Sequence, residues 1–418
     1  MDIKSLSPST GLREPSMLTL TPHKKIIHSK NHARRRTQPS DQISVGIIGI
    51  SGYGRVMLKS LQTAARSEGL RLVAATVINQ AEEKAVCDPL RESGCALFPD
   101  YQSMLKAHGD TLDLCVIPTS IHLHKDMSLH ALDGGCHVLV EKPLAGSVAD
   151  ANKIVQASQQ SGRFVTVGFQ DMFSPATHSI KEFLLSGALG QILSIRASGS
   201  WPRGQSYYSR NNWAGRLTCD GMDVFDSPLN NAFAHFLNLA LYFAAPSLHD
   251  MARVAKTAGH LYRFYPIESY DTANVHLLTG EGVIIDGLFT HVDTTKIDPT
   301  LCIEGTSGRL IWAHEKESVA YDSQGNELRR WTLDAEEGSR QHMIREVLTF
   351  LQGGNRPHFG AESALAHVEA VQKIRTDLEI EEVIHKPLRD GKMRAEWAPV
   401  DGLFQQLVDV SNSRSVVG

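Results

Sequence analysis

Residues 45–54 read VGIIGISGYG, an apolar run that ends in a glycine-rich turn. A helix-like run from Val56 to Ala65 follows directly. Gly49 permits a tight turn after the strand, and Gly54 lets the helix pack closely on that strand. The N–H groups at the start of the helix then have no helical partner and are available to a pyrophosphate. The stretch therefore predicts the first strand–turn–helix unit of a doubly wound parallel sheet that binds a dinucleotide.

The turn departs from the pattern G-x-G-x-x-G at its middle position, which Ser51 occupies. Either Gly52 beside it compensates, or the serine hydroxyl donates a hydrogen bond to the ligand. We expect both residues, and Tyr53 at the start of the helix, to contact the cofactor. The second predicted strand, residues 70–78, is followed by Asn79, which we place at the cofactor where NAD-binding domains carry an acid for the adenosine ribose. Because no arginine stands nearby to receive a 2′-phosphate, the sequence leaves NAD and NADP open.

The tripeptide Glu141-Lys142-Pro143 closes another apolar strand, residues 137–140. In an open α/β sheet the carboxyl ends of the strands form the ligand crevice. Lys142 is therefore expected to reach the group that the glycine turn holds. The alternative interpretation is a solvated pair of charges on a loop.

The loop before this strand, residues 118–124, reads PTSIHLH. Together these stretches resemble the Gfo/Idh/MocA family of nicotinamide-dependent oxidoreductases. The likeness covers residues 43 to about 395 and is most specific at residues 133–144, DGGCHVLVEKPL. The family's loop reads approximately A-T-P-x-x-x-H; here the proline is transposed while the histidines fall in register. The resemblance implies that Thr119 and His122 contact the cofactor.

The resemblance also implies an NAD(P)-dependent dehydrogenase or reductase. Moving a hydride between a carbinol carbon and a nicotinamide requires a proton to leave or join the oxygen. By family likeness, Lys142 lies beside the nicotinamide and the substrate oxygen and exchanges this proton, with a pKa lowered by partial burial. Glu141 is implied to orient the loop or the ribose.

Residues 226–238 read DSPLNNAFAHFLN and form a second candidate site. Ser227 predicts the N-cap of a helix over residues 228–245, a stretch without Asp, Glu, Lys or Arg. Asn231 and His235 recur on one side of that helix. They either satisfy neighbouring backbone groups or line a pocket.

Family members commonly carry Asp-x-x-x-His at this point, with both side chains beside the substrate. This chain keeps Asp226 but has Asn230 at the histidine position. Asparagine can hold a hydroxyl by hydrogen bonds, but it cannot serve as an acid or base near neutral pH. We therefore expect Asp226 to act with Lys142, and His235 to be a second acid/base candidate. Asn230 and Asn231 are expected to bind substrate hydroxyls.

Two further positions indicate the kind of substrate. Gln170 lies in a segment where many relatives place basic residues, which makes an anionic substrate less favoured. Trp201 belongs to a loop rich in aromatic and polar residues, a composition that stacks on sugar faces and bonds hydroxyls. We assign both to substrate binding, although the loop of Trp201 could instead be a lid or a subunit contact.

Beyond residue 165 the pattern changes from alternating strands and helices to longer strands. We predict a Rossmann α/β domain for residues 43–165, an α+β domain with a mostly antiparallel sheet for residues 166–395, and a tail at 396–418. Helices at 340–351 and 361–384 are expected to cover one face of the second sheet. The family likeness implies that the other face joins subunits into homodimers or homotetramers. The predicted strands of this sheet are 192–201, 251–262, 273–278, 283–290, 301–303, 309–312 and 328–333.

The composition is that of an ordinary globular protein: the 418 residues are 42% hydrophobic and 21% charged. Six scattered cysteines without a C-x-x-C pair predict reduced, buried thiols and no metal site. No apolar stretch approaches the about eighteen residues of a membrane span, and no signal peptide is evident. We therefore expect a cytoplasmic enzyme with no membrane partner.

Residues 1–42 differ from the rest, because they hold eight Lys or Arg against three acids and leave a net charge of −9 on the remainder. This segment has little periodicity and is expected to be a disordered, basic extension. The acidic remainder argues against a nucleic-acid partner.

The sequence thus predicts an NAD- or NADP-dependent oxidoreductase that acts on a neutral sugar, polyol or cyclitol. Two alternatives stay open. One is a nicotinamide-binding regulatory sensor without turnover, and the other is a redox-neutral lyase or hydrolase that keeps its NAD tightly bound.

Overall fold

The computed structural model describes residues 42–383 and 397–414. The predicted basic extension, residues 1–42, lies outside the described residues except for its last position. Within the described ranges, no helix is both long and apolar enough to cross a bilayer.

The first sheet has six strands that all pair in parallel, in the order β3-β2-β1-β4-β5-β6. This is the order of a doubly wound dinucleotide-binding domain, so the predicted Rossmann sheet is confirmed. Its central strands are apolar and almost wholly buried, as parallel strands between two helical layers must be. The strands are β1 (Ile43–Ile48), β2 (Leu70–Thr76), β3 (Ala96–Phe98), β4 (Leu114–Ile117), β5 (His137–Val140) and β6 (Val165–Val167).

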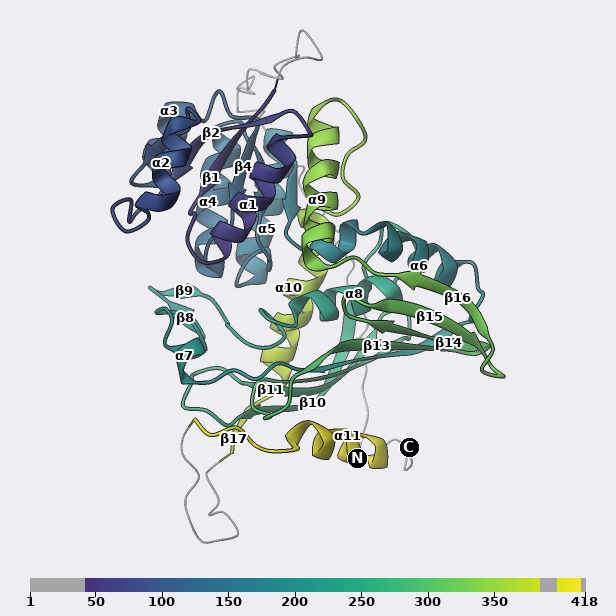
Figure 1. The fold of residues 1–418 in the computed structure, drawn as a ribbon. Coiled ribbons are helices and arrows are strands. Elements are labelled where there is room, and N and C mark those ends of the chain that lie inside the picture. Colours follow the sequence, from purple (N-terminus) through teal and green to yellow (C-terminus); the bar gives the residue numbers. More distant parts are fainter. Residues whose placement is uncertain (1–41, 384–396, 415–418) are drawn as a thin grey trace, which may run out of the picture. The chain divides into compact units, whose positions relative to one another are not determined.

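The helices of this domain begin at residues suited to capping. The Asp100 carboxylate accepts a hydrogen bond from the Ser103 N–H at 2.7 Å, and the Ser147 hydroxyl oxygen accepts one from the Asp150 N–H at 3.3 Å. Figure 1 shows the helices in purple and blue around the first sheet. They are α1 (Tyr53–Ala65), α2 (Lys84–Glu92), α3 (Tyr101–His108), the 3-10 helix η1 (Ile121–Leu123), α4 (His124–Asp133) and α5 (Val148–Ser161).

The second sheet has nine strands in the order β16-β15-β14-β13-β7-β12-β11-β10-β17. Only the pairs β7–β12 and β10–β17 are parallel, so the predicted mostly antiparallel sheet is confirmed. The strands are β7 (Ile192–Ser200), β10 (Val254–Arg263), β11 (Thr272–Thr279), β12 (Ile284–Thr290), β13 (Ile297–Gly305), β14 (Gly308–Ala313), β15 (Glu317–Asp322), β16 (Glu327–Thr332) and β17 (Ile380–Glu382).

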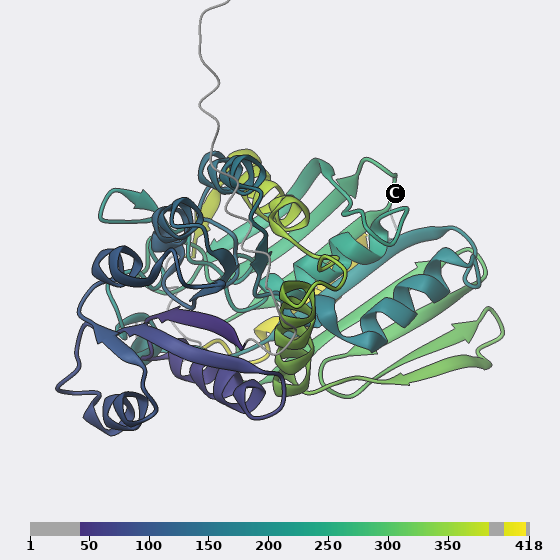
Figure 2. The ribbon, with the colours of Figure 1, turned by 90° about the horizontal axis from the view of Figure 1, so that it is seen from above.

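Helices α6, α8 and α10 pack against strands of this sheet, and Figures 1 and 2 show α6 and α8 over the same face. Helix α9 (Glu336–Leu351) packs mainly against α1 and η2 (Gln170–Phe173), rather than against the second sheet, as was expected of the helix at 340–351. The remaining elements are η2 (Gln170–Phe173), α6 (Pro175–Leu185), α7 (Gln205–Tyr208), the hairpin β8 (Thr218–Cys219) and β9 (Met222–Asp223), α8 (Ala234–Ala244), α9 (Glu336–Leu351), α10 (Ala361–Asp377) and α11 (Leu403–Arg414).

Several predicted helix boundaries differ from those observed. The helix expected over residues 340–351 already begins at Glu336. The helix expected over residues 228–245 begins only at Ala234, because residues 228–233 form successive turns. Ser227 caps the first of these turns, where its hydroxyl oxygen accepts a hydrogen bond from the Asn230 N–H at 3.3 Å. The helix expected over 361–384 ends at Asp377, since the chain then pairs with β10 as strand β17.

The apolar helix α8 is anchored by a buried lysine. Lys181 of α6 has no exposed surface, and its ammonium donates to the carbonyl oxygens of Tyr242 at 2.6 Å and Ala245 at 2.5 Å. These carbonyls lie at the end of α8, where a helix has unpaired acceptors and a partial negative charge. Burial lowers the pKa of Lys181 to about 8. The contact fixes α6 to α8, the helix that carries His235.

The glycine turn between β1 and α1 leaves no room for side chains where strand and helix meet. Gly49 has φ +92°, in the left-handed region that favours glycine. A methyl group added at Gly54 would lie 2.5 Å from the carbonyl oxygen of Gly49. The structure therefore confirms the close approach expected of this turn.

Gly54→Ala is expected to destabilise the protein by about 1–3 kcal/mol, since backbone must move to admit the methyl group. The measurement is the Tm of the variant against that of the natural chain. Gly204→Ala is the matched control, because a methyl group there meets nothing within 4 Å and the backbone is extended. Equal Tm values for the two variants would contradict the close packing.

Candidate active site

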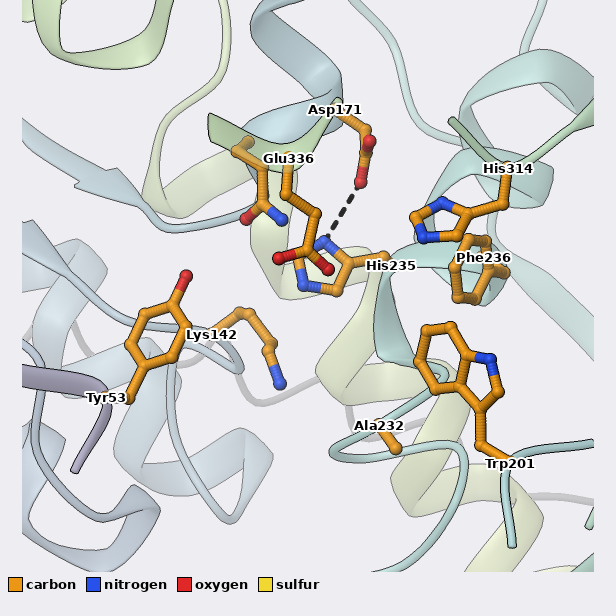
Figure 3. Close-up of a pocket in the computed structure, with 10 residues that line it drawn as sticks. Tyr53, Lys142, Asp171, Trp201, Ala232, His235, Phe236, His314 and Glu336 are labelled. Atoms are coloured by element: carbon orange, nitrogen blue, oxygen red, sulfur yellow. Dashed lines mark ion pairs between the residues drawn. The ribbon is translucent and has the colours of Figure 1, made fainter. Parts of the chain in front are cut away.

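One pocket of about 120 Å³ lies where the carboxyl edge of the first sheet meets α8 and the second sheet. Its walls come from segments far apart in the sequence, as Figure 3 shows. The lining residues are Tyr53, Lys142, Gln170, Asp171, Trp201, Ala232, His235, Phe236, His314 and Glu336. Of the predicted catalytic and substrate residues, the pocket thus brings together Lys142, His235, Gln170 and Trp201.

Lys142 reaches this pocket from the loop after β5 and is held by the second domain. Its ammonium donates to the backbone carbonyl of Asn231 at 2.8 Å and to the side-chain oxygen of the same residue at 3.0 Å. Removal from water lowers the pKa of Lys142, and the nearby carboxylates of Glu141 and Asp226 partly offset this shift. A lysine in such a place exchanges a proton more readily than one in water.

Asp226 does not line the pocket but acts on Lys142 through Asn231. One carboxylate oxygen accepts from the Asn231 side-chain amide at 2.7 Å, and the other accepts from the Gly215 N–H at 2.7 Å. This leaves the amide oxygen of Asn231 turned toward Lys142. Burial raises the pKa of Asp226, and these hydrogen bonds partly offset the shift. The geometry makes Asp226 a positioning residue.

Asn230 likewise does not line the pocket, contrary to the expectation that it binds substrate. It is buried, and its side-chain amide donates to the carbonyl oxygens of Val224 at 3.1 Å and Phe225 at 3.2 Å. Phe225 has φ +51°, an uncommon backbone conformation for a bulky residue. Asn230 therefore braces the turn before α8.

His235 is paired with an acid that the sequence did not single out for this role. Its Nδ1 lies 3.2 Å from a carboxylate oxygen of Asp171 in η2, the ion pair drawn in Figure 3. Two more pocket residues were missed, His314 after β14 and Glu336 at the start of α9. Neither stands in a motif, and only the folded chain brings them to the pocket.

Trp201 forms an apolar wall of the pocket. Its ring stacks on Phe233 with centroids 4.9 Å apart, and its Nε1 donates to Asp298 at 3.1 Å. These two contacts fix the orientation of the Trp201 ring, which lines the pocket. Gln170, also buried, has a side-chain oxygen without a hydrogen-bond partner among the described residues. That oxygen is available to a ligand.

The glycine turn has the features that a dinucleotide phosphate requires. Helix α1 begins after Gly52, which has no side chain to cap the first N–H groups. A methyl group built on Gly52 meets nothing within 4 Å, so the space above the turn is open. The N–H groups of Gly54 and Arg55 donate to the carbonyl oxygens of Ser51 at 3.0 Å and Gly52 at 3.2 Å, so among the described residues the N–H groups left for an anion at this helix start are those of Gly52 and Tyr53. The residues present therefore fit a bound pyrophosphate.

An acidic residue does reach this turn, although the sequence showed none directly after β2. Glu83 accepts a hydrogen bond from the Ser51 hydroxyl at 2.8 Å and pairs with Arg55. The hydroxyl of Ser51 is therefore directed to Glu83. Asn79 donates instead to Glu82 at 3.1 Å. The sequence did not predict the contact of Glu83 with the glycine turn, because Glu83 does not follow β2 directly but stands after an additional turn.

The loop after β4 lies against both the glycine turn and the loop of Lys142. The two ring nitrogens of His124 lie 2.8 Å from the carbonyl oxygen of Pro143 and 3.0 Å from that of Thr119. Lys142 and Pro143 are joined by a cis peptide bond. His124 thus fixes the loop of Lys142 to the loop that carries Thr119 and His122, both expected at the cofactor.

Glu141 is buried directly behind Lys142. One carboxylate oxygen accepts from the Lys142 N–H at 3.1 Å, and the other has no hydrogen-bond partner among the described residues. A methyl group at Gly168 would lie 2.5 Å from this second oxygen, so only glycine leaves room for the carboxylate. Burial raises the pKa of Glu141 to about 7.

Comparison with known proteins identifies the family. Residues 43–169 match the model of the oxidoreductase family with an NAD-binding Rossmann fold, and residues 177–311 match the GFO/IDH/MocA C-terminal domain. The two models describe one family and together span well over half of the chain. The chain therefore belongs to the Gfo/Idh/MocA family and carries its NAD-binding domain.

Two curated relatives illustrate the range of the family. An inositol 2-dehydrogenase from Rubrobacter xylanophilus is 33% identical over 152 residues, which cover 36% of this chain and 42% of that protein. A dTDP-3,4-didehydro-2,6-dideoxy-alpha-D-glucose 3-reductase from Streptomyces violaceoruber is 24% identical over 302 residues, 68% of this chain and 85% of that protein. The match to the inositol dehydrogenase thus spans less than half of its length.

Solved structures agree on the fold. The WlbA dehydrogenase from Bordetella pertussis, in complex with NADH and UDP-GlcNAcA, is 19% identical with a TM-score of 0.66. The likeness covers 80% of this chain and 96% of that one. At this identity it shows the shared architecture.

The raised pKa of Glu141 predicts a pH dependence of stability. Between its ordinary pKa of 4.5 and the folded value of about 7, the folded protein keeps a proton that the unfolded chain has released. Stability therefore falls as pH rises through this range. Glu141→Gln, which has no proton to lose, should be more stable above pH 7 by on the order of 3 kcal/mol.

The measurement for this variant is Tm against pH from 5 to 8, beside Glu92→Gln at the exposed end of α2 as control. The curves of the natural chain and of Glu141→Gln should diverge as pH rises, while the control follows the natural chain. Parallel curves for all three proteins would show that Glu141 is already ionised at low pH.

Proposed function

We propose that the protein is an NAD(P)-dependent oxidoreductase that moves a hydride between the nicotinamide and a carbinol or carbonyl carbon of a neutral sugar, polyol or cyclitol. One observation carries this proposal. Lys142, at the carboxyl edge of a dinucleotide-binding sheet, presents a partly desolvated ammonium to a polar pocket, and this ammonium donates to two oxygens of Asn231.

The dinucleotide, bound on the glycine turn, would give or accept the hydride. Lys142 would exchange a proton with the substrate oxygen, which prevents charge from building on that oxygen as the carbon is reduced or oxidised. Asn231, oriented by Asp226, would hold the ammonium in the position from which it reaches the oxygen. Burial aids the exchange because it brings the lysine pKa closer to neutrality.

The charges around the pocket favour a neutral substrate. Asp171 and Glu336 contribute carboxylates, and an anionic group on the substrate would be repelled by both. Hydroxyl groups can instead donate to these carboxylates and to the side-chain oxygen of Gln170. The flat face of Trp201 suits the apolar C–H face of a sugar or cyclitol ring.

His235 is the second group able to exchange a proton. Its Nδ1 lies 3.2 Å from the Asp171 carboxylate but has no hydrogen-bond partner among the described residues, so the imidazole keeps hydrogen-bonding capacity for the substrate. We assign His235 to holding a hydroxyl next to the reacting carbon and Lys142 to the proton exchange itself, since Lys142 lies at the edge of the dinucleotide-binding sheet. A histidine beside a carboxylate, as His235 is beside Asp171, would also suit the lyase or hydrolase chemistry that the sequence left open.

Lys142→Met should leave dinucleotide binding intact and lower turnover by on the order of 10²–10⁴-fold, because the proton donor is lost while the glycine turn is unchanged. The assay follows the absorbance of reduced nicotinamide with a panel of inositols, aldoses and uncharged nucleotide-free sugars, and dinucleotide binding is titrated separately. Lys153→Met, at an exposed lysine of α5 that pairs with Asp150, is the control and should keep full turnover. Unchanged turnover in Lys142→Met would remove the proposed role.

The same assay separates the alternatives. Dinucleotide binding without turnover on any member of the panel would favour the regulatory sensor. Protein that is purified with NAD attached and converts substrate without net change in nicotinamide absorbance would favour the redox-neutral enzyme.

His235→Gln tests whether His235 only binds a hydroxyl while Lys142 exchanges the proton. Glutamine can still bind a hydroxyl but cannot exchange a proton. We expect KM to rise while kcat stays within about tenfold of the natural value, as for loss of binding that is equal in ground and transition states. A fall in kcat as large as that of Lys142→Met would assign the proton exchange to His235.

A further inference from the structure

Three potential metal ligands meet outside the pocket, where the hairpin β8–β9 lies against η1. A ring nitrogen of His122, the Cys219 sulfur and a carboxylate oxygen of Asp220 all lie within 4.8 Å of one another. The Cys219 Sγ is 3.7 Å from an Asp220 oxygen. His122 belongs to the loop after β4, whereas the other two belong to the hairpin, so the group joins segments distant in the sequence.

An independent observation indicates that this group lacks a ligand. His122 is only 9% exposed, and its Nδ1 has no hydrogen-bond partner among the described residues. Buried polar atoms in folded proteins are nearly always paired, so an unpaired imidazole nitrogen at a cluster of donors needs an explanation. A metal ion bound to the imidazole would provide one.

The donor types identify the class of ion. Calcium and magnesium prefer oxygen ligands throughout, whereas sulfur and imidazole together favour zinc and similar ions. Zinc binds sulfur at about 2.3 Å and nitrogen or oxygen at about 2.0–2.2 Å in tetrahedral geometry, which separates neighbouring ligand atoms by about 3.3–3.7 Å. The spacing found here requires shifts of at most about 1.5 Å to reach that geometry.

The surroundings suit such an ion. Cys219 packs with Ile121 and Val224 in a small apolar cluster, with the ring of Trp213 against it. An apolar shell around a metal limits the access of water and strengthens the bonds to its ligands. Asp220 is exposed, so its carboxylate can move toward an ion at little cost in packing.

We propose that His122, Cys219 and Asp220 form a zinc site with one open coordination position. The ion would tie the hairpin of the second domain to the loop of the first domain that also carries Thr119. This departs from the expectation of no metal, which rested on the sequence spacing of histidines and cysteines. The proposal goes beyond the proposed redox function and does not depend on it.

The other group of three potential ligands, His314, Glu315 and Glu336, carries no such proposal. Glu336 already pairs with Arg340 at 3.1 Å, and Glu315 accepts the Glu336 N–H at 2.7 Å. It also belongs to the pocket described above.

The test is a titration of the full chain, reduced and freed of metal by chelator, with Co²⁺ as the probe ion. We expect one ion per chain, visible bands of tetrahedral intensity and a sulfur-to-cobalt charge-transfer band. Zn²⁺ should abolish these bands by displacement and raise the Tm. Absence of the charge-transfer band would overturn the proposal.

Cys219→Ser should remove the charge-transfer band and weaken ion binding by at least about 10–100-fold. Cys302→Ser is the matched control, because Cys302 also lies beside a carboxylate, with its Sγ 3.2 Å from Glu304, and should bind as the natural chain does. Asp220→Asn, at an exposed position that should not disturb folding, should lose the stabilisation by Zn²⁺ while keeping the Tm of the metal-free protein. Equal ion binding by the natural chain and Cys219→Ser would overturn the site, whatever the outcome of the redox assay.

Discussion

The arrangement of the site depends on how a partly buried ammonium obtains oxygen partners. Lys142 leaves the edge of the first sheet, and among the described residues the hydrogen bonds of its ammonium go to a single residue of the second domain, Asn231. An ammonium withdrawn from water without such partners would lose its charge or its position. The position of the Lys142 ammonium therefore depends on the segment 226–231, which carries Asn231. Gly215 holds this segment through the hydrogen bond that its N–H donates to Asp226, whose other carboxylate oxygen accepts from the Asn231 amide.

A second constraint acts on the other side of Lys142. The Glu141 carboxylate is enclosed, and the absence of a side chain at Gly168 leaves the room that it occupies. Burial disfavours the charged form of both Glu141 and Lys142. The charge of each group partly offsets the pKa shift that burial causes in the other. With its pKa raised to about 7, Glu141 is the member of the pair whose protonation a change of pH near neutrality alters.

The sequence predicted those structural features whose signals lie within a short segment or recur along the chain. The glycine turn, the strand before Glu141 and the alternation of later strands carry their signals within a few residues, and the structure has both sheets where these signals placed them. The beginning of α8 was misjudged because a chain without charged residues shows where burial occurs but not where turns become helix. Strand β15, ESVAYD, was missed because its polar ends hide a buried centre that pairs with two neighbours.

The partnerships at the site were harder to predict because they join distant segments. No spacing connects Asp171 with His235, Glu83 with Ser51, or Cys219 with His122, although each pair lies in contact or close proximity in the fold. Asn230 was expected to bind substrate because of its place in a motif. In the structure its side-chain amide donates to two backbone carbonyls, a contact that the sequence did not predict.

Glu336 belongs to α9, which the ribosome translates long after the strands of the first sheet. Helix α9 closes the pocket from a point far along the chain and rests on α1, one of the first helices to be synthesised. The Rossmann sheet is complete at β6, so it can fold while the ribosome is still translating the remainder. Its carboxyl edge, with the pair Glu141 and Lys142, must then stay without its cover until α9 emerges. A nascent chain that folds in this order would complete its dinucleotide-binding sheet before the helix that closes the pocket has been translated.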